Sequence, residues 1–486
     1  MERIKSQHVV LFPFMTPSHI NPFLALAHRL VRHHPALTVT LVNTRFHIQC
    51  IRSSSFPSPF PSSIRLRSLP FDPAAHGLHP DAENFATVPN HQKLTFLVAS
   101  ESLLPAFDQL IVDIAREDGR PPLCIVADFL LAWTADVAHR YEVFHSVFIP
   151  GGAYGMAVFV SLWTHLPHLK TRSDEFALSE FPDTTIHLSQ LSRLMLLCDG
   201  TDPTSGFYQR LISQWKETNA MLVNTVDEME ATGLRMLRKL FPVPTWAIGP
   251  LLISSHSVAS ASQNRCIMEW LDSQQPASVL YVSFGSLCTI TASQMMEVAT
   301  GLEASEARFI WVIRPSSEFD SNEEFKAEWL PEKFEERMRE RGTGVLVHGW
   351  APQLEILSHT STGAFLSHCG WNSVLESLSR GVPIVAWPLL ADQPHNAKMM
   401  EEMGVCVEVA RGSMESSKAD RTDVERVIRE VMCGGEKAKK MRRRAEEVGE
   451  LMRAAWREGV GSSFKGLADF FRAAASMGDV PSLLID

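Results

Sequence analysis

Short apolar segments of strand type alternate with longer segments of helical periodicity along most of this 486-residue chain. The first set comprises an apolar strand at 8–14, a helix at 21–33 with apolar residues on one face, and a second strand at 37–42. This order is typical of parallel sheets that are covered by helices on both faces. The alternation therefore predicts an α/β protein built from doubly wound sheets.

The alternation stops between residues 248 and 264, where Gly249 and Pro250 precede a Ser-rich run, and then starts again. A chain of this length has room for roughly two to four domains. We interpret the break as a linker between two large domains. The expected division is an N-terminal domain at 1–247, a linker at 248–264, a C-terminal domain at 265–460 and a final helical segment at 461–486.

The charge balance disfavours nucleic-acid and membrane-surface functions. Lys and Arg total 45 against 55 Asp and Glu, which gives a net charge of −10. A chain with this excess of negative charge is not attracted to nucleic acid or anionic lipid. The basic run at 437–444 is interpreted as a solvated helix face balanced by nearby glutamates.

No targeting or membrane-spanning segment is expected. No apolar run approaches the ~20 residues that cross a bilayer, and the N-terminus lacks the pattern of a signal peptide. The 8 cysteines include no CxxC pair, so neither a disulfide framework nor a zinc site is predicted. We expect a cytoplasmic protein without a metal site, and we interpret His165 and His168 as surface or core residues.

Two common enzyme classes with doubly wound domains do not fit. A nicotinamide-dependent dehydrogenase would carry GxGxxG after a predicted strand, whereas the glycines at 151–155 have the wrong spacing. A serine hydrolase would carry GxSxG between a strand and a helix, and this motif is absent from the sequence.

The most polar strand-to-helix junction is Ser-His-Cys-Gly-Trp-Asn-Ser-Val-Leu-Glu at 367–376. A helix N-terminus presents unpaired N–H groups that bind phosphate, and His368, Asn372 and Ser373 add side-chain donors. However, Ser373 and Glu376 also fit a capping box, which needs no ligand. The local pattern alone leaves both interpretations open.

A wider window resembles a known signature. Residues 350–393 are similar to the 44-residue signature of plant family 1 UDP-dependent glycosyltransferases, with WAPQ at 350–353, HCGWNS at 368–373 and Asp-Gln at 392–393. Similarity continues outside this segment, for example in YVSFGS at 281–286. The resemblance implies an α/β GT-B fold, in which two doubly wound Rossmann-like domains face a cleft. The first domain would hold the acceptor and the second would hold most of the UDP-sugar. The segment at 461–486 resembles the closing helix of the family, which returns to the first domain.

The resemblance implies a role for each donor-site residue. Trp350 would stack on uracil beside the backbone of Ala351, and Gln353 and Glu376 would bind the ribose hydroxyls. The diphosphate would be held at the Gly370 turn by Ser286, His368, Asn372 and Ser373. The sugar would be contacted by Trp371, Asp392 and Gln393. Because relatives that use galactose have His at the last position and a glucuronic acid donor is associated with Arg in place of Trp371, UDP-glucose is the expected co-substrate, and no cofactor is implied.

His19 resembles the catalytic histidine of the family, although an isolated histidine near a helix start is more often structural. Asp128, at the end of a predicted strand, resembles the aspartate that hydrogen-bonds this histidine, but it also fits a helix cap. A carboxylate beside an imidazole fixes its tautomer and stabilises the imidazolium. The implied reaction is a metal-independent displacement with inversion, in which His19 is the general base. The alternatives are an inactive UDP-sugar-binding protein and a transferase that uses another UDP-sugar.

The acceptor is the least constrained part of the prediction. Pro17 and Ser18 precede His19, where many family members have Gly, so the acceptor position is expected to differ. An aromatic-rich pocket for a flavonoid, other phenolic, terpenoid or steroid is expected from Phe14, Ser18, Phe85, Phe129, Phe148 and Tyr154. Core packing remains an equal alternative for the aromatic residues. Apart from these small molecules no partner is expected, and the protein is expected to be a monomer.

Overall fold

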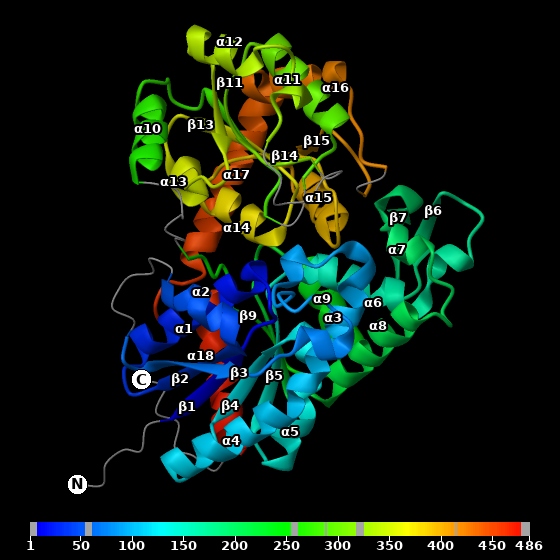
Figure 1. Ribbon diagram of the computed structural model, residues 1–486, viewed down its shortest axis with the longest axis vertical. Helices are drawn as coiled ribbons and strands as arrows, with labels where there is room; N and C mark the ends of the chain where they lie inside the picture. Colours follow the sequence, from blue (N-terminus) through cyan, green and yellow to red (C-terminus); the bar gives the residue numbers. More distant parts are fainter. Residues whose placement is uncertain are drawn as a thin grey trace. The chain divides into compact units, whose positions relative to one another are not determined.

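The computed structural model describes residues 7–53, 61–253, 261–286, 289–316, 325–413 and 416–477. The chain divides into two compact units, one formed by 1–166, 198–254 and 454–486 and the other by 167–197 and 255–453. Each unit contains one large parallel sheet with helices packed on it (Figure 1). The predicted α/β architecture with two doubly wound sheets is confirmed.

The sheet of unit 1 has the strand order β3-β2-β1-β4-β5-β8-β9, and all neighbouring strands are parallel. Most of its strand residues are buried, as expected for a sheet covered on both faces. The strand order reverses beside β1, so the β1–β4 edge is the topological switch point, where such sheets bind ligands. The strands are β1 (His8–Phe12), β2 (Thr38–Thr44), β3 (Ile64–Leu69), β4 (Cys124–Asp128), β5 (Phe144–Ile149), β8 (Ala220–Val223) and β9 (Thr245–Ala247).

The helices of unit 1 are α1 (Pro17–His33), α2 (Arg45–Ser53), α3 (Lys93–Ala99), α4 (Leu104–Asp118), α5 (Thr134–Arg140), α6 (Ala153–His165), α8 (Pro203–Gln214), α9 (Ala231–Leu240) and α18 (Ser462–Met477). In the described part of the chain, one helical stretch, Asn90–Asp118, is long and apolar enough to cross a membrane by length and composition. The sequence analysis did not anticipate it. Its residues Phe96, Phe107 and Ile111 have no exposed surface, so part of this apolar character serves packing within unit 1.

The C-terminal helix α18 completes the core of unit 1. Leu467, Phe470 and Phe471 are buried in the same cluster as residues of β1, β2 and β4. The ring of Phe470 lies 5.7 Å from that of Phe144 on β5. At Gly466 the helix approaches β9 so closely that an added Cβ would lie 2.6 Å from the carbonyl oxygen of Ala247. Helix α18 is therefore part of the packing of unit 1.

Unit 2 contains a six-stranded sheet of order β12-β11-β10-β13-β14-β15, which is also parallel throughout. The strands are β10 (Val279–Ser283), β11 (Arg308–Ile313), β12 (Gly344–His348), β13 (Thr362–Ser367), β14 (Ile384–Ala386) and β15 (Cys406–Glu408). The helices are α7 (Arg193–Leu196), α10 (Ala261–Asp272), α11 (Ala292–Ser305), α12 (Phe334–Arg341), α13 (Gln353–Ser358), α14 (Trp371–Ser379), α15 (Gln393–Glu402), α16 (Arg421–Met432) and α17 (Glu436–Ala454).

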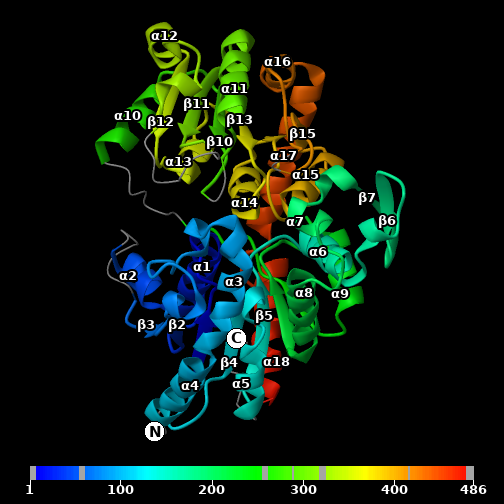
Figure 2. The ribbon, with the colours of Figure 1, turned by 45° about the vertical axis from the view of Figure 1, so that its right-hand side comes forward.

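The segment 167–197 was expected in the N-terminal domain at 1–247. In the structure it groups with unit 2. It contains the antiparallel hairpin of β6 (Glu175–Leu178) and β7 (Phe181–His187), visible in Figure 2. Beyond the hairpin, the carbonyl oxygen of Ser189 accepts a hydrogen bond of 3.1 Å from the hydroxyl of Ser416. Of the expected linker, 248–253 group with unit 1, whereas 254–260 lie outside the described residues.

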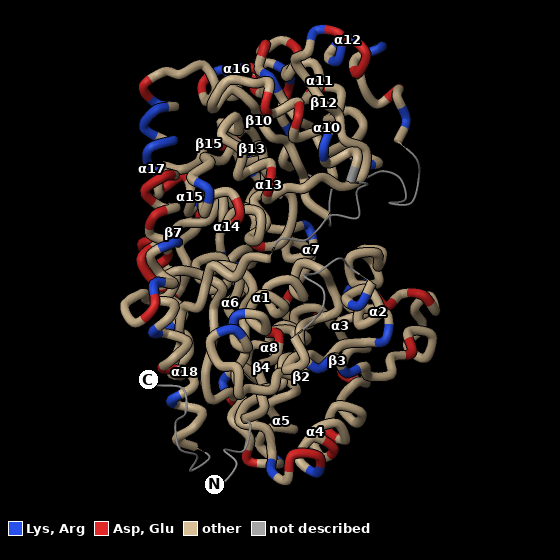
Figure 3. Tube along the Cα trace, turned by 90° about the vertical axis from the view of Figure 1, so that its left-hand side faces the viewer, with Lys and Arg blue, Asp and Glu red and all other residues tan. Residues whose placement is uncertain are grey.

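The basic run falls on α17, where basic residues precede acidic ones along the helix (Figure 3). Lys437 pairs with Glu430, and Arg444 pairs with Glu447 at 2.8 Å. Lys437, Arg444 and Glu447 are exposed and Glu430 is partly exposed, so each pair contributes little to stability. The pairing agrees with the interpretation of the run as a solvated helix face.

We predict that Gly466→Ala lowers the unfolding temperature of the protein. The new methyl group would meet the backbone of β9, and such overpacking costs about 1–3 kcal/mol. The matched control is Gly206→Ala in α8, where an added Cβ meets nothing within 4 Å. This control should be neutral or stabilising, because Ala is favoured over Gly in helices by about 0.5–1 kcal/mol. Thermal unfolding followed by circular dichroism checks both variants, and equal effects would contradict the proposed close packing.

Candidate functional site

The strand register brings His19 and Asp128 together at the switch point of unit 1. Phe12 of β1 pairs with Ala127 of β4, so Asp128 lies just beyond this pair at the carboxyl edge of the sheet. His19 lies in the first turn of α1 rather than in the preceding loop, which corrects the expected helix start at residue 21. The helix begins at Pro17 because proline suits the first helical position. The Nδ1 atom of His19 lies 2.8 Å from Oδ2 of Asp128.

Asp128 has both of the roles that the sequence left open. One carboxylate oxygen contacts His19, while the other accepts a hydrogen bond of 3.1 Å from the backbone N–H of Leu130. The side chain of Asp128 has no exposed surface, whereas that of His19 is 20% exposed. If Nδ1–H is donated to the carboxylate, Nε2 of His19 keeps a lone pair that can accept a proton. The arrangement is an imidazole held by a buried carboxylate, and its other ring nitrogen can accept a proton.

Aromatic rings surround the imidazole of His19. The ring centre of Phe14 lies 6.0 Å from it and that of Phe129 lies 5.6 Å from it. Phe85 packs edge-on against Phe14 at 5.3 Å. Phe14 is fully buried, whereas Phe85, Phe129 and Ser18 are partly exposed. The three phenylalanine rings form an apolar wall beside His19.

The other two residues of the expected acceptor pocket are not part of this wall. Phe148 on β5 has no exposed surface and packs against Phe23 at 4.7 Å in the core. This finding corrects its assignment to the pocket, because β5 is an interior strand covered on both faces. Tyr154 is 5% exposed at the start of α6, where its backbone N–H donates to the carboxylate of Glu230 at 2.9 Å.

A capping box formed by Ser373 and Glu376 would make Ser373 the N-cap of the helix after β13, but this helix begins earlier. Gly370 is the N-cap of α14 and makes no side-chain cap, so Ser373 is the third residue of the helix. The capping-box alternative is therefore excluded. The first turn of α14 keeps N–H groups without helical partners, which is the arrangement that binds phosphate.

His368 lies between two glycines at this helix start. A Cβ added to Gly285, after β10, would lie 2.4 Å from Cε1 of His368, and one added to Gly370 would lie 2.5 Å from Nε2. Gly285 has φ +78 and Cys369 has φ +65, both in the left-handed region. The buried Nδ1 of His368 has no hydrogen-bond partner within the described residues. Burial and, to a smaller extent, the charge of Arg314 lower the pKa of His368 to about 4.

The expected ribose-binding side chains form one hydrogen-bonded network. The amide of Gln353 donates to Glu376 at 2.7 Å and to the hydroxyl of Ser373 at 3.1 Å. The hydroxyl of Tyr281 donates to the amide oxygen of Gln353 at 3.2 Å, which fixes the orientation of the amide. Burial raises the pKa of Glu376 to about 7, although the hydrogen bond from Gln353 and the charge of Arg380 oppose this shift.

The expected base-stacking residue is prominent on the surface of unit 2. Trp350 is 53% exposed after Gly349, whereas Ala351 is 9% exposed. An exposed indole of this size offers a stacking surface for a planar ring. Among the other expected donor-site residues, Trp371 is buried, while Ser286 and Asn372 are partly exposed.

The end of the signature is ordered by hydrogen bonds within unit 2. The amide oxygen of Gln393 accepts hydrogen bonds from the backbone N–H groups of Leu389 and Leu390, at 2.9 and 2.8 Å. Asn396 donates to Asp392 and to the carbonyl oxygen of Cys369, both at 3.1 Å. Asn396 therefore links the segment that is expected to contact the sugar to the turn that precedes α14.

Tyr281, Arg314 and Asn396 lie in or beside the site, although no function was expected for them from the sequence. Tyr281 belongs to the YVSFGS motif, so its position was a signal that could have been used. Arg314 and Asn396 gave no comparable signal, because their contacts join segments that are remote in sequence. Across the described ranges, no group of three or more His, Cys, Asp and Glu side chains is arranged to hold a metal ion.

Comparisons with known proteins identify the family. The family model described as "UDP-glucoronosyl and UDP-glucosyl transferase" matches residues 179–441. The chain is 42% identical to UDP-glycosyltransferase 92A1 of Arabidopsis thaliana over 480 residues, which cover 97% of each chain. It is 44% identical to crocetin glucosyltransferase 3 of Crocus sativus over 430 residues, which cover 85% of this chain and 89% of the relative.

Solved structures agree with the sequence comparison. The structure of Glycyrrhiza uralensis UGT73P12 complexed with glycyrrhetinic acid 3-O-monoglucuronide matches with a TM-score of 0.81 at 27% identity, covering 97% of this chain and 96% of that one. Medicago truncatula UGT71G1 complexed with UDP-glucose matches with a TM-score of 0.78 at 27% identity, covering 98% and 100%. These neighbours confirm the expected GT-B fold. The chain belongs to the UDP-glucuronosyl and UDP-glucosyl transferase family, and it is a UDP-glycosyltransferase that acts on small molecules.

Proposed function

We propose that this protein transfers glucose from UDP-glucose to a hydroxyl group of a small apolar metabolite, with inversion at the anomeric carbon and without a metal ion. The observation that supports the proposal most directly is the pair formed by His19 and the buried carboxylate of Asp128, 2.8 Å apart. A protein that only bound UDP-sugar would have no need of an acid–base pair.

In the proposed reaction, Nε2 of His19 removes the proton from the acceptor hydroxyl as that oxygen attacks the anomeric carbon. The bond from this carbon to the diphosphate breaks, and UDP leaves with the electron pair. Asp128 stabilises the imidazolium that forms on His19. The N-terminus of α14 and the donors around His368 stabilise the charge that grows on the diphosphate.

The assignment of the donor combines the site with the relatives. Medicago truncatula UGT71G1 was solved with UDP-glucose, which supports this donor for the present chain. Trp371 and Gln393 occupy positions where other residues are associated with glucuronic acid and galactose. The oxygen of the Gln393 amide is held by backbone N–H groups, so its NH₂ group is proposed to contact the sugar. The alternative is another UDP-sugar, since Arabidopsis thaliana UGT89C1 was solved with UDP-L-rhamnose.

For the acceptor we propose a flat or bulky apolar molecule with a hydroxyl group. The ring wall of Phe14, Phe85 and Phe129 beside His19 favours such a molecule over a polar one. The relatives include a crocetin glucosyltransferase, a scopoletin glucosyltransferase from Nicotiana tabacum and a Phytolacca americana protein solved with pterostilbene. We propose that the protein acts as a monomer in the cytoplasm.

The proposal is tested by incubating the protein with UDP-glucose and a panel of phenolic, terpenoid and steroid acceptors. We expect UDP release and a product heavier by one hexose, with activity unchanged by EDTA. His19→Ala should lower the rate by about 10²–10⁴-fold, the usual contribution of a general base. It should leave UDP-glucose binding intact. If wild type binds UDP-glucose but no member of a broad panel is glycosylated, the binding-only alternative gains support.

Asp128→Asn separates the two roles of this residue. The amide oxygen can still cap the turn at Leu130, whereas the negative charge beside His19 is lost. We expect kcat to fall about 10- to 100-fold, the value of a charge-assisted hydrogen bond, with little change in thermal stability. The matched control is Asp118→Asn, which alters another His–Asp pair, with His8 at 2.5 Å. That pair lies at the opposite end of β1, so the control should retain kcat, and equal losses would contradict the assignment.

UDP-glucose binding should weaken as the pH falls below about 7. Burial raises the pKa of Glu376 to about 7, so the carboxyl group of the free protein becomes protonated below that pH. The ribose hydroxyls are proposed to donate to the ionised carboxylate, so the affinity should fall by up to about tenfold per pH unit. Above about pH 8 it should be constant. UDP-glucose is the suitable probe because its diphosphate has no group that titrates in this range.

The measurement is isothermal titration calorimetry between pH 5.5 and pH 8.5. Glu376→Gln carries no titratable group at this position, so its weaker binding should show no pH dependence in this range. A pH dependence that persists unchanged in this variant would assign the titration to another group.

A further inference from the structure

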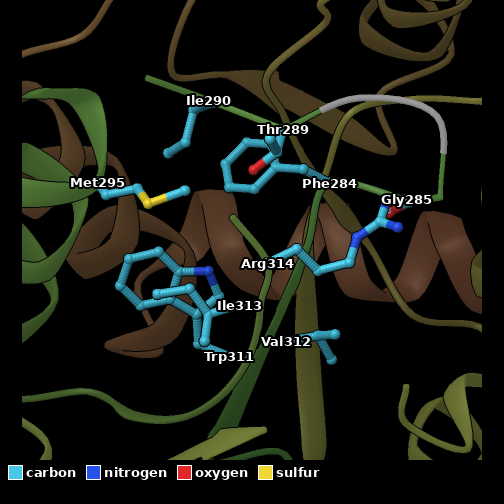
Figure 4. Close-up of a pocket in the computed structure, with 9 residues that line it drawn as sticks. All are labelled: Phe284, Gly285, Thr289, Ile290, Met295, Trp311, Val312, Ile313 and Arg314. Carbon is cyan, nitrogen blue, oxygen red and sulfur yellow. Dashed lines mark hydrogen bonds between the residues drawn. The ribbon is translucent and has the colours of Figure 1, made fainter. Parts of the chain in front are cut away.

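A cavity at the carboxyl ends of β10 and β11 contains an arginine without an assigned function. Its lining includes Gly285, Met295, Trp311, Ile313 and Arg314. Figure 4 shows Arg314 extending along this cavity toward Gly285. One guanidinium nitrogen of Arg314 donates a hydrogen bond to the carbonyl oxygen of Gly285.

The strand register explains this contact. Ser283 of β10 pairs with Val312 of β11 on one side and with Ser367 of β13 on the other. Gly285 and Arg314 each lie two residues beyond this row. The guanidinium is therefore separated by one glycine from the ring of His368, since a Cβ on Gly285 would collide with that imidazole. Arg314 consequently belongs to the layer from which the proposed diphosphate ligands project.

The chemistry of the proposed donor site requires positive charge near the diphosphate. UDP leaves with more negative charge on its terminal phosphate than it carried in the sugar donor. Burial and the nearby guanidinium keep His368 neutral at physiological pH, because its pKa is lowered to about 4. The N-terminus of α14 contributes about half a positive charge. A guanidinium, by contrast, carries a full charge at every relevant pH.

We propose that Arg314 is a positioning and charge-compensating residue for the diphosphate of the donor. It holds the Gly285–Ser286 turn through the Gly285 carbonyl and supplies positive charge to the departing UDP. This inference rests on the proposed donor site and adds to it a residue that lies outside the 350–393 signature. Met295, Trp311 and Ile313, which line the cavity, are each 1% exposed. They exclude water from one side of the Arg314 guanidinium, which strengthens its interaction with a nearby negative charge.

The test compares the binding of two ligands that differ only in the diphosphate. UDP binding is measured by calorimetry, and uridine binding is measured by competition. For Arg314→Met we expect the affinity for UDP to fall roughly 10- to 100-fold, as for the loss of a charge-assisted interaction. The affinity for uridine should change less than about twofold on the same reasoning. Arg314→Lys should recover part of the UDP affinity, because it retains the charge but not the planar fork.

The matched control is Arg308→Met at the start of the same strand. Arg308 is exposed and lies at the opposite end of β11, so both affinities should stay at the wild-type values. Equal UDP affinity in wild type and Arg314→Met would overturn the inference. Equal losses for UDP and uridine in both Arg314 variants would also overturn it, since they indicate a purely structural role. If the wild-type protein itself does not bind UDP, it is the proposed donor site that fails.

Discussion

The close packing of the His368 imidazole against Gly285 and Gly370 determines how the turn after β10 lies against the start of α14. His368 occupies the volume in which side chains at positions 285 and 370 would otherwise lie. This close packing holds the turn after β10 against the start of α14. The left-handed conformations of Gly285 and Cys369 allow the chain to turn within this space. A single steric constraint therefore determines where the free N–H groups of α14 point and where Ser286 lies.

Such an arrangement has a cost, which indicates its function. A buried polar atom without a partner costs about 1–3 kcal/mol, and Nδ1 of His368 is such an atom among the described residues. A non-glycine residue at positive φ adds strain at Cys369. Strained and unpaired groups of this kind cluster at active sites and ligand sites, which agrees with the donor site proposed for unit 2. The two units use the carboxyl edges of their sheets differently, because unit 1 places an anion there, Asp128, whereas unit 2 places neutral donors and the cation Arg314.

The sequence predicted those features that depend on local pattern. Strands β1 and β2 were located to within two residues at each end, because a strand buried on both faces is apolar along most of its length. Helix starts were less predictable, since Pro17 moved the start of α1 ahead of His19 and Gly370 moved the start of α14 ahead of Ser373. The spacing of apolar residues in these two helices does not indicate where either helix begins.

Contacts between remote segments could not be predicted from the sequence. The grouping of 167–197 with unit 2 involves the hydrogen bond between Ser189 and Ser416, 227 residues apart. The hydrogen bond from Tyr281 to Gln353 spans 72 residues. In the sequence, Arg314 is one of 45 Lys and Arg residues, and nothing sets it apart. Only the register of β10, β11 and β13 shows that it lies beside Gly285.

The proposed reaction can be derived from the structure in more detail than the identity of the acceptor. The residues proposed to react lie at strand ends and helix starts, where the sheet register fixes their positions. Phe14, next to His19, is fully buried and packs against Phe85 and Phe96, so it can support the proposed base whatever molecule is bound. The partly exposed rings of Phe85 and Phe129 lie instead on short 3₁₀ turns, Phe85–Thr87 and Phe129–Leu131. Substitutions in these turns can change the shape of the acceptor site without disturbing the sheet, so acceptor choice can vary between relatives that share the same reaction.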